Sequence, residues 1–317
     1  MKISLLEPIG ISKEKVDGLA SKLLEEGHEF QYFDTKTTDA GELYERSKDS
    51  DVVMIANNPY PAEVIEKLDR LKMISVAFTG VDHVGLTACR KKNIMVCNAA
   101  GYSNQTVAEL VLGMAVDAMR GVVKSDSLVR GGKGSFGVSG REICGKTVGI
   151  IGLGRIGLMC AKLFLAFGAK VIAYNRSRNP EAESIGIVYK ELAQVLAESD
   201  IISLNLPLND ETRGFISGDK IALMKKNAVF INCARGPIVD NKALADALNE
   251  DKIGFACIDV FDMEPPLPAD YPLLHAKNTL LTPHQAYISE EAMERRAEIV
   301  FGNVCAWLKG EPENVIK

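Results

Sequence analysis

The chain lacks two features, a long hydrophobic run and an excess of basic charge, and both absences narrow its function. No segment approaches the roughly 20 apolar residues that a membrane helix needs, and the apolar run within residues 1–8 is too short for a secretory signal. The formal net charge is −5, whereas nucleic-acid-binding proteins usually carry a basic patch or stripe. We therefore expect a cytoplasmic protein that binds neither membrane nor nucleic acid.

The cysteines also lack a pattern. Their number is seven, which is odd, and none forms a Cys-x-x-Cys pair. A disulfide framework and a zinc site are therefore not indicated. No cluster of His, Asp and Glu has ligand spacing either, so we expect no metal. For Cys233 a small buried hydrophobic residue is the simpler interpretation, and a redox role is the alternative.

What the chain does have is a repeated alternation of apolar runs and helical patterns. Its 317 residues, 47% hydrophobic and 25% charged, are enough for two globular domains. One series of short apolar runs starts at Ile3, and a stronger series starts at Val148. Such alternation predicts an α/β fold with two doubly wound parallel sheets and crossover helices.

The stronger series begins with Val-Gly-Ile-Ile-Gly-Leu-Gly-Arg-Ile-Gly, which combines a strand, a glycine turn and a helix start. In a dinucleotide site the first glycine of Gly-x-Gly-x-x-Gly permits a tight turn, the second admits the pyrophosphate, and the third lets the helix pack on the strand. The two residues after the second glycine offer N–H groups at a helix N-terminus, which favours anionic oxygens. The predicted dinucleotide contacts are Gly152, Gly154, Arg155, Ile156 and Gly157.

The next strand ends at Asn175, where an NAD site usually has Asp or Glu for the ribose hydroxyls. The following Arg176, Ser177 and Arg178 supply two cations and a hydroxyl group. These groups suit a 2′-phosphate, which a carboxylate would repel. We therefore expect NAD or NADP with a preference for NADP(H); a solvated basic loop is the alternative.

Two helical patterns mark the domain organisation. Apolar residues recur at helical spacing over Val107–Arg120, which predicts a long helix between the domains. Another amphipathic helix is predicted over Glu290–Leu308, and we expect it to return to the first domain. We predict that a Rossmann dinucleotide-binding domain of residues 100–287 is inserted in a flavodoxin-like substrate domain of residues 1–99 and 288–317. The glycine-rich stretch 131–140 predicts a surface loop.

The order of motifs along the chain resembles the D-isomer-specific 2-hydroxyacid dehydrogenases, a family that includes glyoxylate and hydroxypyruvate reductases and phosphoglycerate dehydrogenase. The motifs are Gly152–Gly157, Leu206-Pro207-Leu208 with Glu211-Thr212, Asn232–Gly236, Asp259–Pro265 and Thr282-Pro283-His284. The resemblance implies that Arg235 clamps the substrate and that Glu264 orients His284. It also implies cofactor contacts from Leu206, Pro207, Thr212, Cys233, Ala234 and Asp259, the last with the nicotinamide carboxamide.

The chemistry of these residue types agrees with that implication. A 2-oxo acid has a carboxylate beside a carbonyl, and the planar guanidinium of Arg235 suits both groups. Hydride transfer leaves an alkoxide that needs a proton, and histidine is the side chain that ionises near neutral pH. A carboxylate such as Glu264 would hold the His284 ring in one orientation. Taken singly, each has a structural alternative: an ion pair for Arg235, a turn for Glu264 and a strand cap for His284.

A loop in the first series completes the predicted site. Phe78, Thr79 and Gly80 follow the strand that starts at Met73, and Gly80 permits close backbone approach. In the resembled family the N–H groups of this loop hold the substrate carboxylate; an ordinary strand-to-helix turn is the alternative. His83 lies next to this loop. Tyr287 stands where the family commonly has Gly or Ser.

We therefore predict an NAD(P)-dependent oxidoreductase that interconverts a small 2-oxo acid and the D-2-hydroxy acid, with glyoxylate or hydroxypyruvate as first candidates. The alternatives are a relative of formate dehydrogenase and a non-catalytic, dinucleotide-sensing interaction protein of the same fold. The long helix from Val107 and the glycine-rich loop after it lie where the resembled family pairs subunits, so we expect a homodimer.

Overall fold

The structure, a computed structural model, describes residues 1–135 and 139–316 and divides into two compact units. Unit 1 comprises Met1–Ser103 and Ile288–Lys317, and unit 2 comprises Asn104–Tyr287. Unit 2 is thus inserted in unit 1 along the chain, as predicted. The first division falls after Ser103, where the sequence suggested residue 99. Residues 136–138 of the predicted glycine-rich loop lie outside the described residues.

Unit 1 is built on a parallel sheet of five strands in the order β2-β1-β3-β4-β5, which is the order of flavodoxin-like folds, the class predicted for this domain. The strands are β1 (Lys2–Leu5), β2 (Glu29–Tyr32), β3 (Val52–Ile55), β4 (Met73–Val76) and β5 (Met95–Cys97). The helices are α1 (Lys13–Glu25), α2 (Ala40–Ser47), α3 (Ala62–Ile65), α4 (Leu86–Lys91) and α12 (Glu290–Leu308). Every residue of β3 and β4 is buried, because helices cover both faces of such a sheet.

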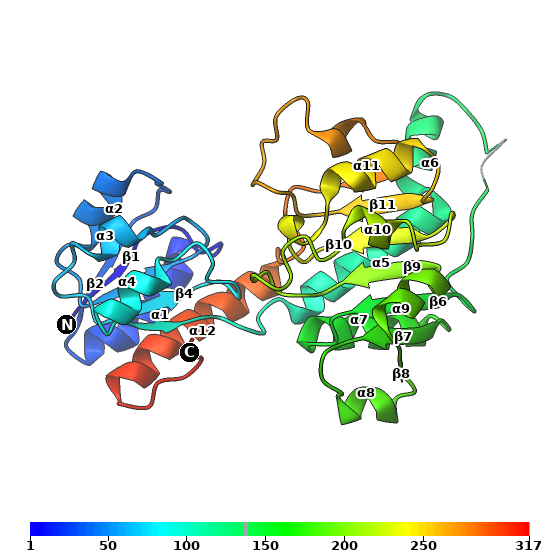
Figure 1. The fold of residues 1–317 in the computed structure, drawn as a ribbon. Coiled ribbons are helices and arrows are strands. Elements are labelled where there is room, and N and C mark those ends of the chain that lie inside the picture. Colours follow the sequence, from blue (N-terminus) through cyan, green and yellow to red (C-terminus); the bar gives the residue numbers. More distant parts are fainter. Residues whose placement is uncertain (136–138, 317) are drawn as a thin grey trace. The chain divides into compact units, whose positions relative to one another are not determined.

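Helix α12 packs on the sheet of unit 1, which confirms the predicted return of the chain (Figure 1). The helix begins at Ser289, whose hydroxyl accepts the N–H of Ala292. Farther along, Ser75 Oγ of β4 donates to the carbonyl of Val300 at 3.0 Å. The buried Asn303 donates from Nδ2 to the carbonyl of Asn98 at 2.9 Å. The C-terminal helix is therefore part of the core of unit 1.

Unit 2 is built on a parallel sheet of seven strands in the order β12-β11-β10-β9-β6-β7-β8, a Rossmann order with an added strand. The strands are β6 (Thr147–Ile151), β7 (Lys170–Tyr174), β8 (Val188–Tyr189), β9 (Ile201–Leu204), β10 (Val229–Asn232), β11 (Phe255–Ile258) and β12 (Thr279–Leu281). The helices are α5 (Asn104–Arg120), α6 (Val122–Arg130), α7 (Arg155–Ala166), α8 (Pro180–Ser184), α9 (Leu192–Glu198), α10 (Gly218–Ile221) and α11 (Asn241–Asn249), with short 3₁₀ turns at Gly236–Ile238 and Pro272–His275.

The long helix α5 packs against α7, and its buried stripe includes Val107, Val111 and Met114. It ends where Gly121 adopts a left-handed conformation with φ of 62°, and α6 starts directly afterwards. Helix α6 has no buried residue. The helix therefore packs no apolar stripe against the core of its unit, and such a stripe is the feature by which the sequence analysis predicts a helix.

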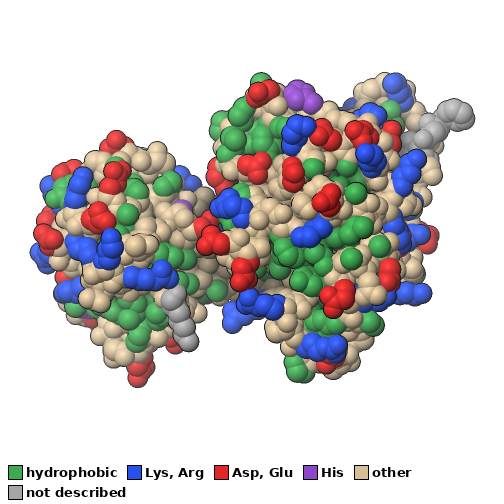
Figure 2. All heavy atoms as spheres, viewed as in Figure 1, with side chains coloured by type: hydrophobic (Ala, Val, Ile, Leu, Met, Phe, Trp, Pro, Cys, Tyr) green, Lys and Arg blue, Asp and Glu red, His purple; other side chains and the backbone are tan. Residues whose placement is uncertain are grey.

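Figure 2 shows charged side chains of both signs on one face of the molecule. On the face drawn in Figure 2, acidic and basic side chains are intermixed over each unit. None of its helices combines the length and apolar character needed to cross a membrane. Within residues 1–135 and 139–316, no group of three or more His, Cys, Asp or Glu side chains is arranged to hold a metal ion.

Candidate active site

The glycine turn after β6 leaves space at the N-terminus of α7. A Cβ on Gly152, whose φ is +92°, would lie 2.7 Å from the carbonyl oxygen of Asn205, and a Cβ on Gly157 would lie 2.0 Å from that of Gly152. The packing of the protein itself therefore requires these two glycines. Gly154, the N-cap of α7, differs, because a Cβ there would meet no described atom within 4 Å. Open space at a helix N-terminus fits a pyrophosphate.

The side chain of Asn175 links this turn to the end of β7 by hydrogen bonds. Its Oδ1 accepts the N–H of Leu153 at 3.0 Å, and its Nδ2 donates to the carbonyl of Ser177 at 2.7 Å. The two arginines that follow have highly exposed side chains in ion pairs, Arg176 with Glu211 at 3.3 Å and Arg178 with Glu183 at 2.8 Å. Exposed ion pairs contribute little stability, so both guanidinium groups can exchange these partners for a phosphate.

The loop after β9 lies beside the same turn. A Cβ on Gly152 would approach Cδ2 of Leu206 to 3.0 Å. Farther along this loop, Thr212 Oγ1 donates to the carbonyl of Pro207 at 2.6 Å and accepts the N–H of Asn209 at 2.8 Å. The threonine therefore closes a small turn that starts next to the dinucleotide turn.

Arg235 is positioned by a turn after β10. Asn232 Oδ1 accepts the N–H of Ala234 at 3.0 Å, and Asn232 Nδ2 donates to the carbonyl of Arg235 at 3.1 Å. A Cβ on Gly236 would lie 1.9 Å from the carbonyl oxygen of Phe261, so only glycine fits there. Sequence reasoning did not assign a role to Asn232, and its only signal was its place in the motif.

His284 and Glu264 form the hydrogen-bonded pair that the sequence predicts. His284 Nδ1 lies 2.8 Å from Oε1 and 3.0 Å from Oε2 of Glu264. The His284 side chain is 15% exposed and that of Glu264 is 71% exposed. His284 has a φ of +54°, which is uncommon for a residue with a side chain. The ring of Tyr287 meets the imidazole edge-on, with 5.5 Å between centroids.

Asp259 holds the backbone around His284. Its buried carboxylate accepts hydrogen bonds from Thr282 Oγ1 at 2.5 Å and from the N–H groups of Gln285 and Ala286, both at 2.9 Å. Burial raises the pKa of Asp259 above its ordinary value, although these hydrogen bonds oppose the shift. Asp259 is 0% exposed, so the structure shows its carboxylate holding the backbone beside His284 and not open to the predicted nicotinamide carboxamide.

Cys233 lies close to Asp259 and to Met114, whose Sδ is 3.6 Å from its Sγ. Burial raises the pKa of the Cys233 thiol well above its usual range, and the Asp259 carboxylate adds to the effect. The thiol therefore stays protonated at neutral pH, as expected of a hydrophobic packing residue.

The topology explains why these side chains belong together. Strands β10, β11 and β12 are neighbours in the sheet. Arg235 follows the carboxyl end of β10, Asp259 and Glu264 follow that of β11, and His284 follows that of β12. This is the edge at which open α/β sheets bind ligands.

In unit 1, two carbonyl groups near the start of the loop after β4 accept hydrogen bonds. The carbonyl of Phe78 accepts the N–H of Ala99 at 2.9 Å, and that of Thr79 accepts Nδ2 of Asn98 at 2.7 Å. No described residue accepts a hydrogen bond from the N–H of Thr79 or Gly80. Two backbone donors are therefore left for an anion. Sequence reasoning missed Asn98, because its contact depends on the pairing of β4 with β5.

Known proteins with a dinucleotide-binding domain are similar to this chain in sequence. Residues 112–286 match the sequence profile of the family described as "D-isomer specific 2-hydroxyacid dehydrogenase, NAD binding domain". The D-3-phosphoglycerate dehydrogenase of Methanocaldococcus jannaschii is 41% identical over 302 residues, which are 94% of this chain and 57% of that relative. The chain thus spans a little over half the length of that protein.

Two further similarities extend over the whole chain. The hydroxypyruvate reductase of Blautia hydrogenotrophica is 34% identical over 323 residues, which cover 100% of this chain and 99% of that protein. A solved structure of an acyclic imino acid reductase (Bsp5) in complex with NADPH and D-Arg has a TM-score of 0.89 and 31% identity and covers 100% of both chains.

Proposed function

Because this chain belongs to the D-isomer specific 2-hydroxyacid dehydrogenase family of NAD(P)-dependent oxidoreductases, we propose that it interconverts a small 2-oxo acid and the corresponding D-2-hydroxy acid. The observation that carries the proposal is the Glu264–His284 hydrogen bond of 2.8 Å. This pair lies at the same sheet edge as Arg235, which follows a neighbouring strand. Together they supply a proton donor and a cation suited to a carboxylate.

In the proposed reaction each residue has one task. An ionised Glu264 can only accept a hydrogen bond, so Nδ1 of His284 donates to it and Nε2 is the nitrogen that exchanges a proton with the substrate oxygen. The guanidinium of Arg235 binds the substrate carboxylate and polarises the neighbouring carbonyl. Within unit 1, the N–H groups of Thr79 and Gly80 suit a carboxylate oxygen. The nicotinamide, when bound, supplies or accepts the hydride.

For the substrate, we propose glyoxylate or hydroxypyruvate. The aromatic ring of Tyr287 against His284 takes up space beside the proton donor, which favours a short substrate side chain. A full-length relative named hydroxypyruvate reductase supports the same choice.

For the cofactor, we propose a preference for NADP(H). The residue at the end of β7 is the neutral Asn175, and the highly exposed Arg176 and Arg178 follow it. A 2′-phosphate gains from two guanidinium groups and meets no carboxylate at position 175. The similar imino acid reductase was solved with NADPH, which supports this preference.

We also propose a homodimer that pairs through α6. Three valines of this helix are highly exposed: Val122 at 54%, Val123 at 55% and Val129 at 71%. A helix with no buried residue has little to stabilise it within one chain, so a second copy is the natural cover for its apolar side.

The activity is tested by following absorbance at 340 nm with NADPH and with NADH in the presence of glyoxylate, hydroxypyruvate, pyruvate, phenylpyruvate and 2-oxoisocaproate. We expect oxidation with glyoxylate or hydroxypyruvate and a higher kcat/KM with NADPH. Dinucleotide binding without reduction of any of these acids would favour the non-catalytic, dinucleotide-sensing alternative. A higher kcat/KM with NADH would overturn the cofactor preference alone.

A further inference from the structure

Asp262, in the loop after β11, is bound from two sides within unit 2. Its Oδ1 accepts a hydrogen bond from Nδ2 of Asn241 at 2.8 Å, and its Oδ2 accepts one from the hydroxyl of Tyr271 at 2.9 Å. Asn241 is 4% exposed and Tyr271 is 6% exposed, so both donors belong to the interior of the unit. The Asp262 carboxylate therefore ties its loop to two other buried segments.

Asn241 also reaches the loop that carries Arg235. Its Nδ2 donates to the carbonyl of Gly236 at 3.3 Å, and because both neighbours of this amide are acceptors, the nitrogen is the atom that faces them. Asn241 is the first residue of α11, whose start is capped by Asp240: its Oδ1 accepts the N–H of Ala243 at 2.9 Å. One amide thus joins the loop after β10 to the loop after β11.

Tyr271 contacts the loop after β11 through its ring as well as its hydroxyl. The ring meets that of Phe261 edge-on, with 5.8 Å between centroids. The N–H of Asp262 donates to the Tyr271 hydroxyl at 3.4 Å. Tyr271 directly precedes the 3₁₀ turn Pro272–His275, which packs on α11. Both donors of the Asp262 carboxylate therefore lie in elements that pack on each other.

The position of Asp262 matters because Glu264 lies two residues farther along the same loop. The Glu264 side chain is 71% exposed, and the place of an exposed carboxylate depends largely on the backbone that carries it. Its partner His284 is held separately, since the N–H of His284 donates to the carbonyl of Asp259 at 2.8 Å. The hydrogen bond between the two side chains therefore depends on where the loop runs at Asp262.

We propose that Asp262 is a positioning residue that keeps the Glu264 carboxylate hydrogen-bonded to His284, an inference that rests on the proposed function. Asp262 acts through Glu264 and not on the reacting atoms. An imidazole that is free to turn presents Nε2 correctly for a smaller fraction of the time, which slows proton transfer. The backbone of Arg235 has its own link to Asn232, so substrate binding changes less than the rate.

The test compares Asp262→Ala with Asp262→Asn. The asparagine amide offers Oδ1 to Asn241 and an N–H to the hydroxyl of Tyr271, which accepts as well as donates, so both links survive without the charge. Alanine removes both. We expect single-turnover oxidation of bound NADPH by glyoxylate or hydroxypyruvate to slow about tenfold in Asp262→Ala, with KM for the acid within about threefold. The asparagine variant should stay within about threefold of wild type in both quantities, and an equal loss of rate in the two variants would overturn the proposal.

A double-mutant cycle shows whether Asp262 acts through Glu264. Once Glu264→Ala has removed the carboxylate, nothing is left for Asp262 to position, so we expect Asp262→Ala to slow that variant by less than about threefold more. A further tenfold loss would make Asp262 a general structural residue and overturn the proposal. Asp246→Ala is the matched control, since it removes an exposed carboxylate of α11 that pairs with Lys242, and we expect the wild-type rate.

The imidazole of His284 gives a measurement that does not need the reaction. In protein with isotope-labelled histidine, nuclear magnetic resonance follows exchange of the Nδ1–H of His284 with water, and loss of the signal in His284→Ala assigns it. We expect slow exchange in wild type and in Asp262→Asn. Exchange should be faster in Asp262→Ala and in Tyr271→Phe, which removes one link and keeps the ring.

This measurement separates the proposal from the proposed function. If wild-type protein reduces no 2-oxo acid, the proposed function fails, and the exchange rate still decides whether Asp262 orders the pair of Glu264 and His284. Unchanged exchange in Asp262→Ala would contradict the positioning role directly.

Discussion

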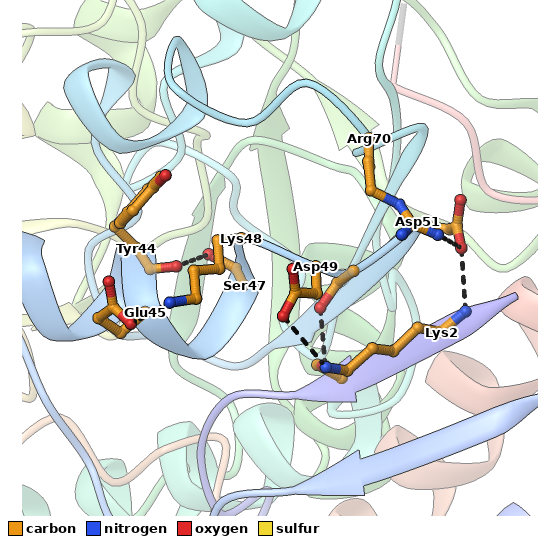
Figure 3. A network of polar contacts seen from close by, with 10 residues as sticks. Lys2, Tyr44, Glu45, Ser47, Lys48, Asp49, Asp51 and Arg70 are labelled. Carbon is orange, nitrogen blue, oxygen red and sulfur yellow. Dashed lines mark hydrogen bonds and ion pairs between the residues drawn. The ribbon is translucent and has the colours of Figure 1, made fainter.

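Asp51 and Asp200 occupy equivalent positions in the two units. Each precedes the strand that pairs with the first strand of its unit, and each accepts at Oδ2 the N–H of that first strand's first residue, Lys2 or Thr147, at 2.9 Å. Each also has a lysine ammonium on Oδ1, at 3.0 Å from Lys72 and at 2.8 Å from Lys225. Figure 3 shows the Lys2–Asp51 contact in unit 1.

This arrangement predicts acid-sensitive stability. Burial raises the pKa of both carboxyl groups, but the backbone N–H and the ammonium group outweigh burial, and each pKa lies below its ordinary value. Such a carboxylate stabilises the fold above its unfolded-state pKa of about 3.9, and the contribution is lost as the pH falls through the lower folded-state pKa. We expect Asp200→Asn to cost about 1 kcal/mol at pH 7, because the pair is partly exposed.

The measurement is the free energy of unfolding in urea from pH 7 to pH 2. The difference between wild type and Asp200→Asn should shrink below about pH 4 as the wild-type carboxyl group becomes protonated. Asp251→Asn serves as the control, since the Asp251 carboxylate makes an exposed pair with Lys277 at 3.5 Å and no other ion pair among the described residues. A difference that stays constant down to pH 2 would contradict the account.

The two glycines at the start of α7 predict opposite phenotypes. In Gly157→Ala the new Cβ would lie 2.0 Å from a carbonyl oxygen, so we expect the thermal midpoint to fall by several degrees.

In Gly154→Ala the new Cβ meets open space, so stability should change by less than about 1 kcal/mol. Its Kd for the dinucleotide should rise at least about tenfold, because the methyl group occupies the space of the pyrophosphate. Titration of each variant with NADPH, beside thermal unfolding, checks both results; unimpaired binding by Gly154→Ala would remove the pyrophosphate from this turn.

The two arginines after β7 predict that their removal weakens the binding of NADPH and not that of NADH. Replacing Arg176 and Arg178 together by alanine should raise KM for NADPH about tenfold or more and leave KM for NADH within about threefold, because only NADPH carries the 2′-phosphate. Lys242→Ala removes an exposed cation from α11 and is the control for net charge. An equal rise in KM for NADPH and for NADH in the double variant would show that the arginines do not bind the 2′-phosphate.

Most strands were predictable from the sequence because buried parallel strands are continuous apolar runs, whereas the two-residue β8 was missed and the strand orders were not predicted. Val148 and Ile201, for example, both lie in such runs and pair in the central sheet. Helix α6 was not predicted, although Val122 and Val129 lie seven residues apart, because its apolar side covers no core within one chain. Helix α9 was also missed, although its capping box, Glu191 with Gln194, is a signal that a search for helix starts would find.

The candidate site was predictable where residue type carries the chemistry, as with Arg235, Glu264 and His284. The groups that position them were not, because their contacts link positions far apart in the chain. Asp259 reaches Gln285 across 26 residues, and Asn98 reaches Thr79 across 19 residues. Such contacts depend on strand order and loop geometry, which apolar periodicity does not encode.

The exposed valines of α6 predict the effect of a charge on assembly. In sedimentation at micromolar concentration we expect wild-type protein at twice the mass of the chain. Val129→Glu should yield a single chain, because the dimer would bury an unpaired carboxylate. Val188→Glu introduces the same charge at a similarly exposed valine on β8 and should remain dimeric. A wild-type protein that sediments as one chain would contradict the dimer.

In the proposed mechanism His284 transfers the proton that accompanies hydride transfer. The most direct test is single-turnover oxidation of bound NADPH by the best 2-oxo acid, with wild type and His284→Ala compared at saturating substrate. We predict a rate lower by a factor of about 10² to 10⁴ in the variant, with an unchanged Kd for NADPH, because the methyl group leaves the cofactor contacts in place but supplies no proton. A variant rate within about threefold of wild type would contradict the proposed mechanism.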